Sequence, residues 1–70
     1  MDLYLARVTR KVTQWELARR TGISQAQISL FERGYREPSD EIKQKIAGAI
    51  DIPVDVINWP VVKSTAAVRA

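Results

Sequence analysis

Apolar residues recur at three- and four-residue spacing along most of the chain, a pattern typical of short amphipathic helices. No segment shows the strict alternation of a strand, and no internal repeat or low-complexity segment is present. The predicted helices cover approximately residues 3–9, 14–21, 25–33, 40–49 and 53–59. We therefore predict an all-α fold, a compact bundle of five short helices.

Capping residues mark the ends of the second and third helices. Thr13 and Glu16 form a Thr-x-x-Glu capping box, and Ser24 and Gln27 form a Ser-x-x-Gln box. Each helix is followed by a glycine that can take a positive φ angle, Gly22 or Gly34. The second helix is too short to be stable in isolation, so its packing against the other helices must hold it in place.

The chain of 70 residues is long enough for one domain at most. We predict a helical domain over residues 1–60 and a tail over residues 61–70 that is flexible or takes part in a dimer contact. Apolar positions on the inward faces of the helices are predicted to form the core. They are Leu3, Leu17, Ala18, Ile23, Ile28, Phe31, Ile42, Ile46, Ile50 and Ile57.

The chain contains no cysteine and no histidine. Disulfides, zinc sites built from these residues and catalysis by a thiol or an imidazole are therefore excluded. There is no Gly-rich phosphate loop, and the acidic residues are scattered rather than clustered as metal ligands. We predict that the protein is not an enzyme and uses no cofactor or metal.

Positive charge is concentrated in the first half of the chain. Residues 1–36 hold seven Lys/Arg and three Asp/Glu, a balance of +4, whereas residues 37–70 hold four and five, a balance of −1. A localised basic region suits a phosphate-bearing partner. No apolar run approaches the ~20 residues of a membrane span, and no signal peptide is evident, so we expect a cytoplasmic protein without membrane contact.

Residues 13–34 resemble the helix-turn-helix of the Cro- and phage-repressor-type family, also called the xenobiotic-response-element class. The resemblance covers roughly residues 3–58 and is specific as a combined pattern. The matching residues are Thr13-Gln14, Glu16-Leu17-Ala18, Gly22-Ile23-Ser24-Gln25, Ile28-Ser29, Glu32-Arg33-Gly34, Pro38-Ser39 and Lys45-Ile46-Ala47. The resemblance implies a repressor-like fold in which the third helix enters the major groove of double-stranded DNA.

Five residues of the third helix are candidates for base contacts. Gln25 is the first choice, because glutamine can bond adenine N6 and N7 together; a solvated surface glutamine is the alternative. Gln27 either contacts DNA or caps the backbone of Ser24. Ser29 touches a base or a phosphate, or is simply solvated. Ala26 and Leu30 depart from the family pattern and can make only apolar contacts, such as with thymine methyl groups, while Leu30 could instead pack against a neighbouring helix.

Other residues are candidates for contacts with the DNA backbone. The family uses a glutamine at the start of the second helix, here Gln14, to bond a phosphate and to brace the recognition glutamine. Basic and aromatic candidates for phosphate contact are Arg10, Lys11, Arg33, Tyr35 and Arg36. Arg19 and Arg20 either join them or interact with the helix dipole. Trp15 is expected to be partly exposed near DNA.

Two features of the resemblance concern the fold itself. The family pairs an arginine and a glutamate at the positions of Arg7 and Glu32, which implies a structural ion pair between the first and third helices. Lys11 stands where many relatives carry glycine. It must either take a left-handed conformation or change the turn.

The leading functional hypothesis is a sequence-specific DNA-binding transcriptional regulator, specifically a repressor that binds a pseudo-palindromic operator as a homodimer. The expected dimer surface is the fifth helix, with Val54, Val56 and Trp59, extended by Val61 and Val62. The alternative is a protein-interaction module on the same fold, either an antitoxin that binds a toxin or an adaptor.

Overall fold

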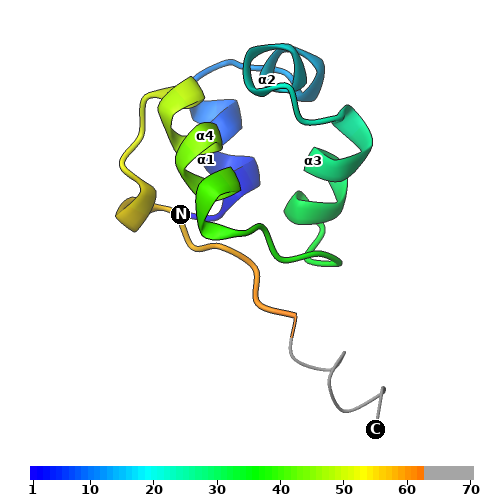
Figure 1. The fold of residues 1–70 in the computed structure, drawn as a ribbon. Coiled ribbons are helices and arrows are strands. Elements are labelled where there is room, and N and C mark those ends of the chain that lie inside the picture. The colour runs from blue at the N-terminus through cyan, green and yellow to red at the C-terminus, as the bar shows by residue number, and fades with distance from the viewer. Residues whose placement is uncertain (63–70) are drawn as a thin grey trace, which may run out of the picture.

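In the computed structural model, which describes residues 1–62, short helices pack around a single apolar centre (Figure 1). The elements in chain order are α1 (Leu3–Thr9), α2 (Gln14–Thr21), α3 (Gln25–Glu32), α4 (Asp40–Ile50) and the 3₁₀ turn η1 (Val54–Val56). The predicted all-α class is confirmed: within residues 1–62 the only strand-like pairing is an isolated bridge between Asp2 and Asn58.

Side-chain caps begin all four α-helices. Each cap oxygen accepts a hydrogen bond from the backbone N–H three residues later, and the caps are Asp2, Thr13, Ser24 and Ser39. The predicted starts of α2 and α3 are therefore confirmed. The reciprocal bond of a capping box is not formed in either helix within the described part of the chain. In α2 the carboxylate of Glu16 binds Arg19 and Arg20 instead.

The predicted fifth α-helix is wrong. Residues 54–56 make a single 3₁₀ turn, and Ile57 is already extended at φ −94° and ψ 129°. The backbone of this segment is bonded to the start of the chain instead. The N–H of Asn58 donates to the carbonyl of Met1 at 2.6 Å, and the Met1 ammonium donates to the carbonyl of Val56 at 3.2 Å. These long-range bonds satisfy backbone groups that a helix would have paired locally.

The core is centred between α2, α3 and α4 and is completed by α1 from behind (Figure 1). Leu3, Leu17, Ile28, Ile46 and Ile50 are fully buried, as predicted. Ala18, Ile23 and Ile42 pack against this cluster but are only partly buried. Four buried residues are absent from the predicted core: Ala6 and Ala47, which lie on helices, and Val12 and Ile52, which lie in loops where no helical spacing marks them.

The turn between α1 and α2 resolves the two alternatives for Lys11. Its φ angle is +59°, so the residue takes the left-handed conformation. The backbone N–H groups of Lys11 and Val12 donate to the carbonyls of Val8 and Arg7, which holds this conformation in place. Within residues 1–62, none of the helices has the length and apolar character to cross a membrane.

Candidate DNA-binding surface

A tight turn sets the angle between α2 and α3. Gly22 ends α2 at φ +77°, and its N–H donates to the carbonyl of Ala18 at 2.8 Å. The hydroxyl of Thr21 donates to the carbonyl of Leu17 at 2.8 Å and accepts from the N–H of Ile23 at 3.1 Å. Because both helices are bonded to this turn and packed on the core, the start of α3 is held rigidly beside α2.

The outer side of α3 carries the predicted base-contact residues. Ala26 is exposed, while Gln25, Gln27, Ser29 and Leu30 are partly exposed, and the inward positions Ile28 and Phe31 are buried. Ser24 caps α3 by accepting from the Gln27 backbone. The Gln27 side chain makes no hydrogen bond to Ser24 within the described residues, so the capping role considered for it is not the one observed.

A chain of side-chain hydrogen bonds runs from the core to the start of α3. Glu32 accepts from Arg7 and also from the Nε2 of Gln14, the latter at 2.9 Å. The Oε1 of Gln14 then accepts from the Nε2 of Gln25 at 2.6 Å. One buried ion pair thereby fixes the orientation of both glutamines.

The ion pair at the base of this chain is almost fully enclosed. The Arg7 and Glu32 side chains are 10% and 4% exposed, and their contact is bidentate, with the second bond at 3.1 Å. The Nη1 of Arg7 donates to the carbonyl of Val12 at 2.7 Å. All three guanidinium nitrogens are therefore satisfied inside the protein, and Arg7 offers no charge to a ligand.

A comparison with known protein families identifies the family of this chain. The model of the helix-turn-helix family (HTH_3) matches residues 3–57. The chain belongs to the helix-turn-helix family. The resemblance read from the sequence is thus confirmed.

Relatives of this helix-turn-helix protein occur in Mycobacterium tuberculosis. Two proteins with the name uncharacterized HTH-type transcriptional regulator, from the CDC 1551/Oshkosh and H37Rv strains, are each 37% identical over 51 residues. The match covers 73% of this chain but 36% of each relative, so the chain spans about a third of the length of the curated relatives it matches. No solved structure gives a significant match.

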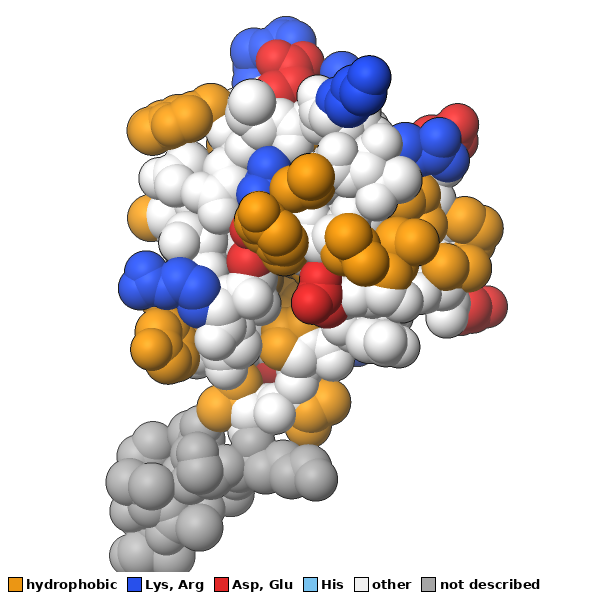
Figure 2. Space-filling model, turned by 180° about the vertical axis from the view of Figure 1, so that it is seen from behind, with side chains coloured by type: hydrophobic (Ala, Val, Ile, Leu, Met, Phe, Trp, Pro, Cys, Tyr) orange, Lys and Arg blue, Asp and Glu red, His pale blue; other side chains and the backbone are white. Residues whose placement is uncertain are grey.

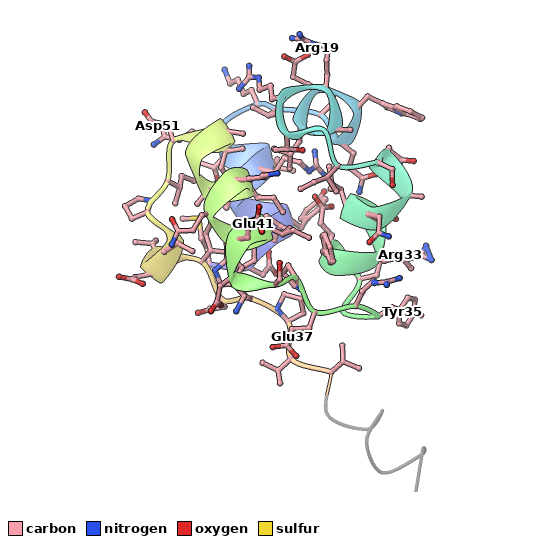
Figure 3. The ribbon with its side chains drawn as sticks, in the orientation of Figure 1. Arg19, Arg33, Tyr35, Glu37, Glu41 and Asp51 are labelled. Carbon is pink, nitrogen blue, oxygen red and sulfur yellow. The ribbon has the colours of Figure 1, made fainter. Side chains whose placement is uncertain are left out.

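The basic residues of this helix-turn-helix domain differ in whether their side chains bind other parts of the protein. Lys11, Arg33 and Arg36 are exposed and form no ion pair within residues 1–62, whereas Arg10 donates to the carbonyl of Asp51 at 2.9 Å. The Arg33 guanidinium lies over the ring of Tyr35 at 5.3 Å, and Figure 3 shows the two side chains together just beyond α3. Charge is thus available for phosphate beside the C-terminal end of α3.

Arg19 and Arg20 are less available. Both bind the carboxylate of Glu16, and Arg20 also donates to the carbonyl of Ala49 at 3.0 Å. Hydrogen bonds from Arg19 and then Arg20 hold the pKa of Glu16 below its ordinary value. Their charge is partly neutralised, which agrees with a local electrostatic role for these two arginines.

Trp15 is the largest exposed side chain beside the start of α3. It is 70% exposed, and its indole N–H makes no hydrogen bond within the described residues. Together with Arg19, Ser24 and Gln25, it lines a shallow concavity between α2 and α3. The sequence predicts a Trp15 that is partly exposed near DNA, whereas the concavity that Trp15 shares with Gln25 depends on the turn geometry.

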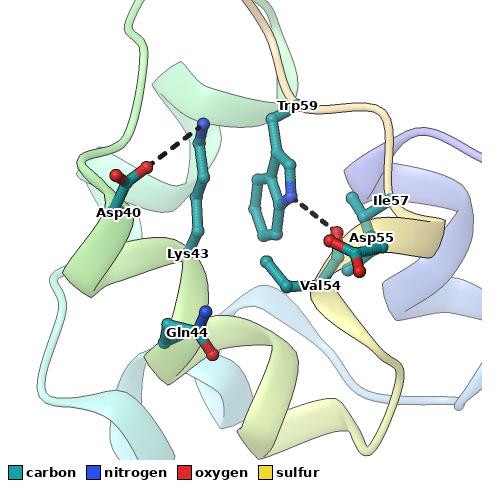
Figure 4. A pocket seen from close by; sticks show the side chains of 7 residues that line it. All are labelled: Asp40, Lys43, Gln44, Val54, Asp55, Ile57 and Trp59. Atoms are coloured by element: carbon teal, nitrogen blue, oxygen red, sulfur yellow. Dashed lines mark hydrogen bonds and ion pairs between the residues drawn. The ribbon is translucent and has the colours of Figure 1, made fainter.

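The other tryptophan has a different setting. Trp59 packs against the core, and its Nε1 donates to the carbonyl of Val54 at 3.0 Å (Figure 4). Val54 also packs on the core. Of the five residues expected at a dimer contact, Val56 and Val61 are exposed, and Val54, Trp59 and Val62 are partly exposed.

Proposed function

We propose that this chain is a sequence-specific DNA-binding transcriptional regulator that inserts α3 into the major groove. The observation that carries the proposal is the hydrogen-bond chain from the Arg7–Glu32 pair through Gln14 to Gln25. It presents a pre-oriented amide at the start of an exposed helix. The names of the two mycobacterial relatives support the same role.

The direction of the hydrogen bonds supports a preference for one base. Glu32 can only accept, so Gln14 donates through Nε2 and turns its Oε1 toward Gln25. Gln25 then donates one N–H to Gln14 and keeps its Oε1 and a second N–H free. Adenine offers a matching N6–H donor and N7 acceptor, whereas guanine offers two acceptors in the major groove. Gln25 is therefore suited to adenine and unsuited to guanine.

The other exposed residues of α3 would contact bases with fewer hydrogen bonds and more apolar contacts. Ala26 and Leu30 can contact thymine methyl groups, and Ser29 and Gln27 can donate or accept hydrogen bonds at bases or phosphates. With apolar side chains at two groove-facing positions, part of the specificity rests on methyl contacts and on DNA shape.

Backbone contacts flank the recognition helix on both sides. Gln14 and the free N–H groups at the start of α2 bind one phosphate, since helix N-termini favour anions. Arg10 and Lys11 extend this side, and the indole of Trp15 packs on the adjacent sugar and donates to a phosphate oxygen. At the opposite end of α3, phosphates are bound by Arg33, Tyr35 and Arg36. Together these contacts supply most of the affinity.

Two copies acting on a pseudo-palindrome would give a domain of this size enough contact for tight specificity. The half-sites would lie one helical turn, roughly 34 Å, apart. Binding in this way suits a repressor that occludes a promoter in the cytoplasm.

Selection of bound sites from a random DNA library tests the proposal. A pseudo-palindrome with adenine at one position of each half-site is expected. Gel shifts on that sequence should weaken steeply with salt, with a slope of about −0.9 per neutralised phosphate. Failure to enrich any sequence, with weak salt-insensitive binding, would refute the proposal and favour an antitoxin or adaptor role on the same fold.

A further inference from the structure

The amide of Gln25 keeps its hydrogen bond in one orientation only. The carboxylate of Glu32 can only accept, so the Nε2 of Gln14 faces it at 2.9 Å and the Oε1 of Gln14 faces Gln25. The Nε2 of Gln25 donates to that oxygen at 2.6 Å. Turning the Gln25 amide over would bring two oxygen acceptors together. The Oε1 of Gln25 is therefore held at the end of the amide that is turned away from Gln14.

The adenine edge that suits this orientation contains a hydrogen that can be replaced chemically. The N6 amino group of adenine carries two hydrogens, and the pair with thymine uses one of them. The other points into the major groove beside N7, where the Oε1 of Gln25 would accept it in the proposed complex. A methyl group on N6 of a paired adenine occupies this second position, because the first is needed for base pairing. Methylation thus replaces the donor for Gln25 by a carbon atom.

Such a methyl group would break a hydrogen bond in either of two ways. If the Gln25 amide keeps its bond to Gln14, its Oε1 faces a methyl group and its second N–H is pushed away from N7. If the amide moves aside, the bond to Gln14 is lost and the oxygen of that residue has no donor. Leaving a polar group unsatisfied in a contact that excludes water costs more than an ordinary hydrogen bond contributes.

The surface around Gln25 indicates that methylation would act on the base contact alone. The other outward residues of α3 are uncharged: Ala26, Gln27, Ser29 and Leu30. The acidic side chain of α3, Glu32, is only 4% exposed. Figure 2 shows the molecule from behind, with the edge formed by α3 on the left, where apolar, uncharged polar and basic side chains form the outline. Because N6-methylation leaves the phosphate charge unchanged, contacts of these basic side chains with phosphate would persist.

We propose that the hydrogen-bond chain from Glu32 through Gln14 to Gln25 makes this protein a reader of adenine methylation. It binds its operator when the adenine facing Gln25 is unmodified, and it is released when that adenine carries an N6-methyl group. This inference rests on the proposed function, because Gln25 must contact adenine. It adds a means of regulation, a covalent mark on the DNA, to base readout.

Binding to synthetic operator duplexes tests the inference. An operator selected from unmodified random DNA is made with N6-methyladenine at the position whose base preference is lost in Gln25→Ala. We expect the wild-type dissociation constant to rise at least about tenfold, since an acceptor is left unpaired. The slope of affinity against salt should stay the same, because the phosphate contacts are kept. The same modification at an adenine that flanks the operator is the matched DNA control and should leave the dissociation constant unchanged.

Protein variants show whether the two glutamines cause the effect. Gln25→Ala should bind methylated and unmodified operators equally, because it has no acceptor that loses its donor. Gln14→Ala should show a smaller effect than the wild type, since Gln25 can then move aside without losing a bond. Gln44→Ala, at an exposed glutamine on α4, is the control and should keep the full effect. Low salt keeps the weaker complexes measurable, and circular dichroism verifies that each variant is folded.

The outcomes separate this inference from the proposed function. Equal wild-type affinity for methylated and unmodified operators overturns the inference and leaves sequence-specific binding standing. A methylation effect of full size in Gln25→Ala or in Gln14→Ala also overturns it, because the hydrogen-bond chain would then not be the cause. Absence of specific binding to any unmodified sequence refutes the proposed function, and the inference with it.

Discussion

The side-chain amide of Gln25 donates to the side-chain oxygen of Gln14 at 2.6 Å, and Gln14 is itself held by Glu32. The residue that we propose reads a base is therefore oriented by a residue on the other helix of the motif. In the proposed complex this one contact would link base readout to domain packing, so substitutions far from DNA would alter specificity.

Substitution of these glutamines should change specificity more than stability. Gln25→Ala is expected to remove the preference for adenine at one operator position, a loss of about 1–3 kcal/mol of discrimination. Gln14→Ala should weaken that preference partially, because Gln25 keeps its bonding groups but loses its brace. Competition gel shifts with single-base operator variants measure both effects. Gln44→Ala, an exposed glutamine on α4, is the control, and an unchanged base preference in Gln25→Ala would contradict the proposed readout.

The enclosed Arg7–Glu32 pair should dominate the electrostatic contribution to stability. Arg7→Ala leaves a nearly buried carboxylate without its partner, which is expected to cost about 3 kcal/mol of unfolding free energy. Urea denaturation measures this loss. The double variant Arg7→Ala/Glu32→Ala should lose less than the sum of the single losses. Lys45→Ala removes an exposed pair with Glu41, at 4.0 Å, and should cost under about 1 kcal/mol. Equal losses for Arg7→Ala and Lys45→Ala would be inconsistent with a buried pair.

The lowered pKa of Glu16 predicts a small dependence of stability on pH. The arginines Arg19 and Arg20 favour its ionised form in the folded state, so its contribution is present above the ordinary pKa of 4.5. This contribution is lost as the pH falls through the lower pKa of the folded state. Thermal melts of the wild type and Glu16→Gln should therefore differ near neutral pH and converge in acid. A difference that persists unchanged in acid would show that ionisation of Glu16 is not its source.

Trp15 offers a test of the proposed backbone contacts. Because a sugar and a phosphate carry no sequence information, Trp15→Ala should weaken binding to operator and to random DNA by similar factors, each about tenfold. Trp15→Phe should weaken binding less than Trp15→Ala does, since it keeps an aromatic ring but loses the N–H donor. Gln44→Ala, at an exposed residue on α4, is the control. A loss confined to the operator would instead assign Trp15 to base readout.

The parts of the fold that depend on neighbouring residues could be predicted from the sequence. Thr13, Ser24 and Gly22 act within one helical turn, so the limits of α2 and α3 follow from them. η1 could not be predicted, because its conformation depends on bonds to Met1, which is more than fifty residues away in the chain.

The candidate site shows the same division between local and long-range information. The exposed positions on α3 follow from helical spacing around Ile28 and Phe31. The order of hydrogen bonds from Glu32 to Gln25 joins two helices and is visible only in the structure.

Lys11 combines a backbone cost with a proposed phosphate contact, and one substitution separates the two. Its φ angle of +59° is unfavourable for a residue with a side chain, so Lys11→Gly should relieve strain and raise the unfolding free energy by about 0.5–1 kcal/mol. The same change removes a charge, so DNA binding should weaken and the salt slope should fall by about 0.9. Asp51→Gly is the matched control, since Asp51 has a φ angle of +58° at the end of α4. It should stabilise the fold without lowering the salt slope. If Lys11→Gly leaves the salt slope unchanged, Lys11 does not contact phosphate, and the basic contribution on that side of α3 falls to Arg10 alone.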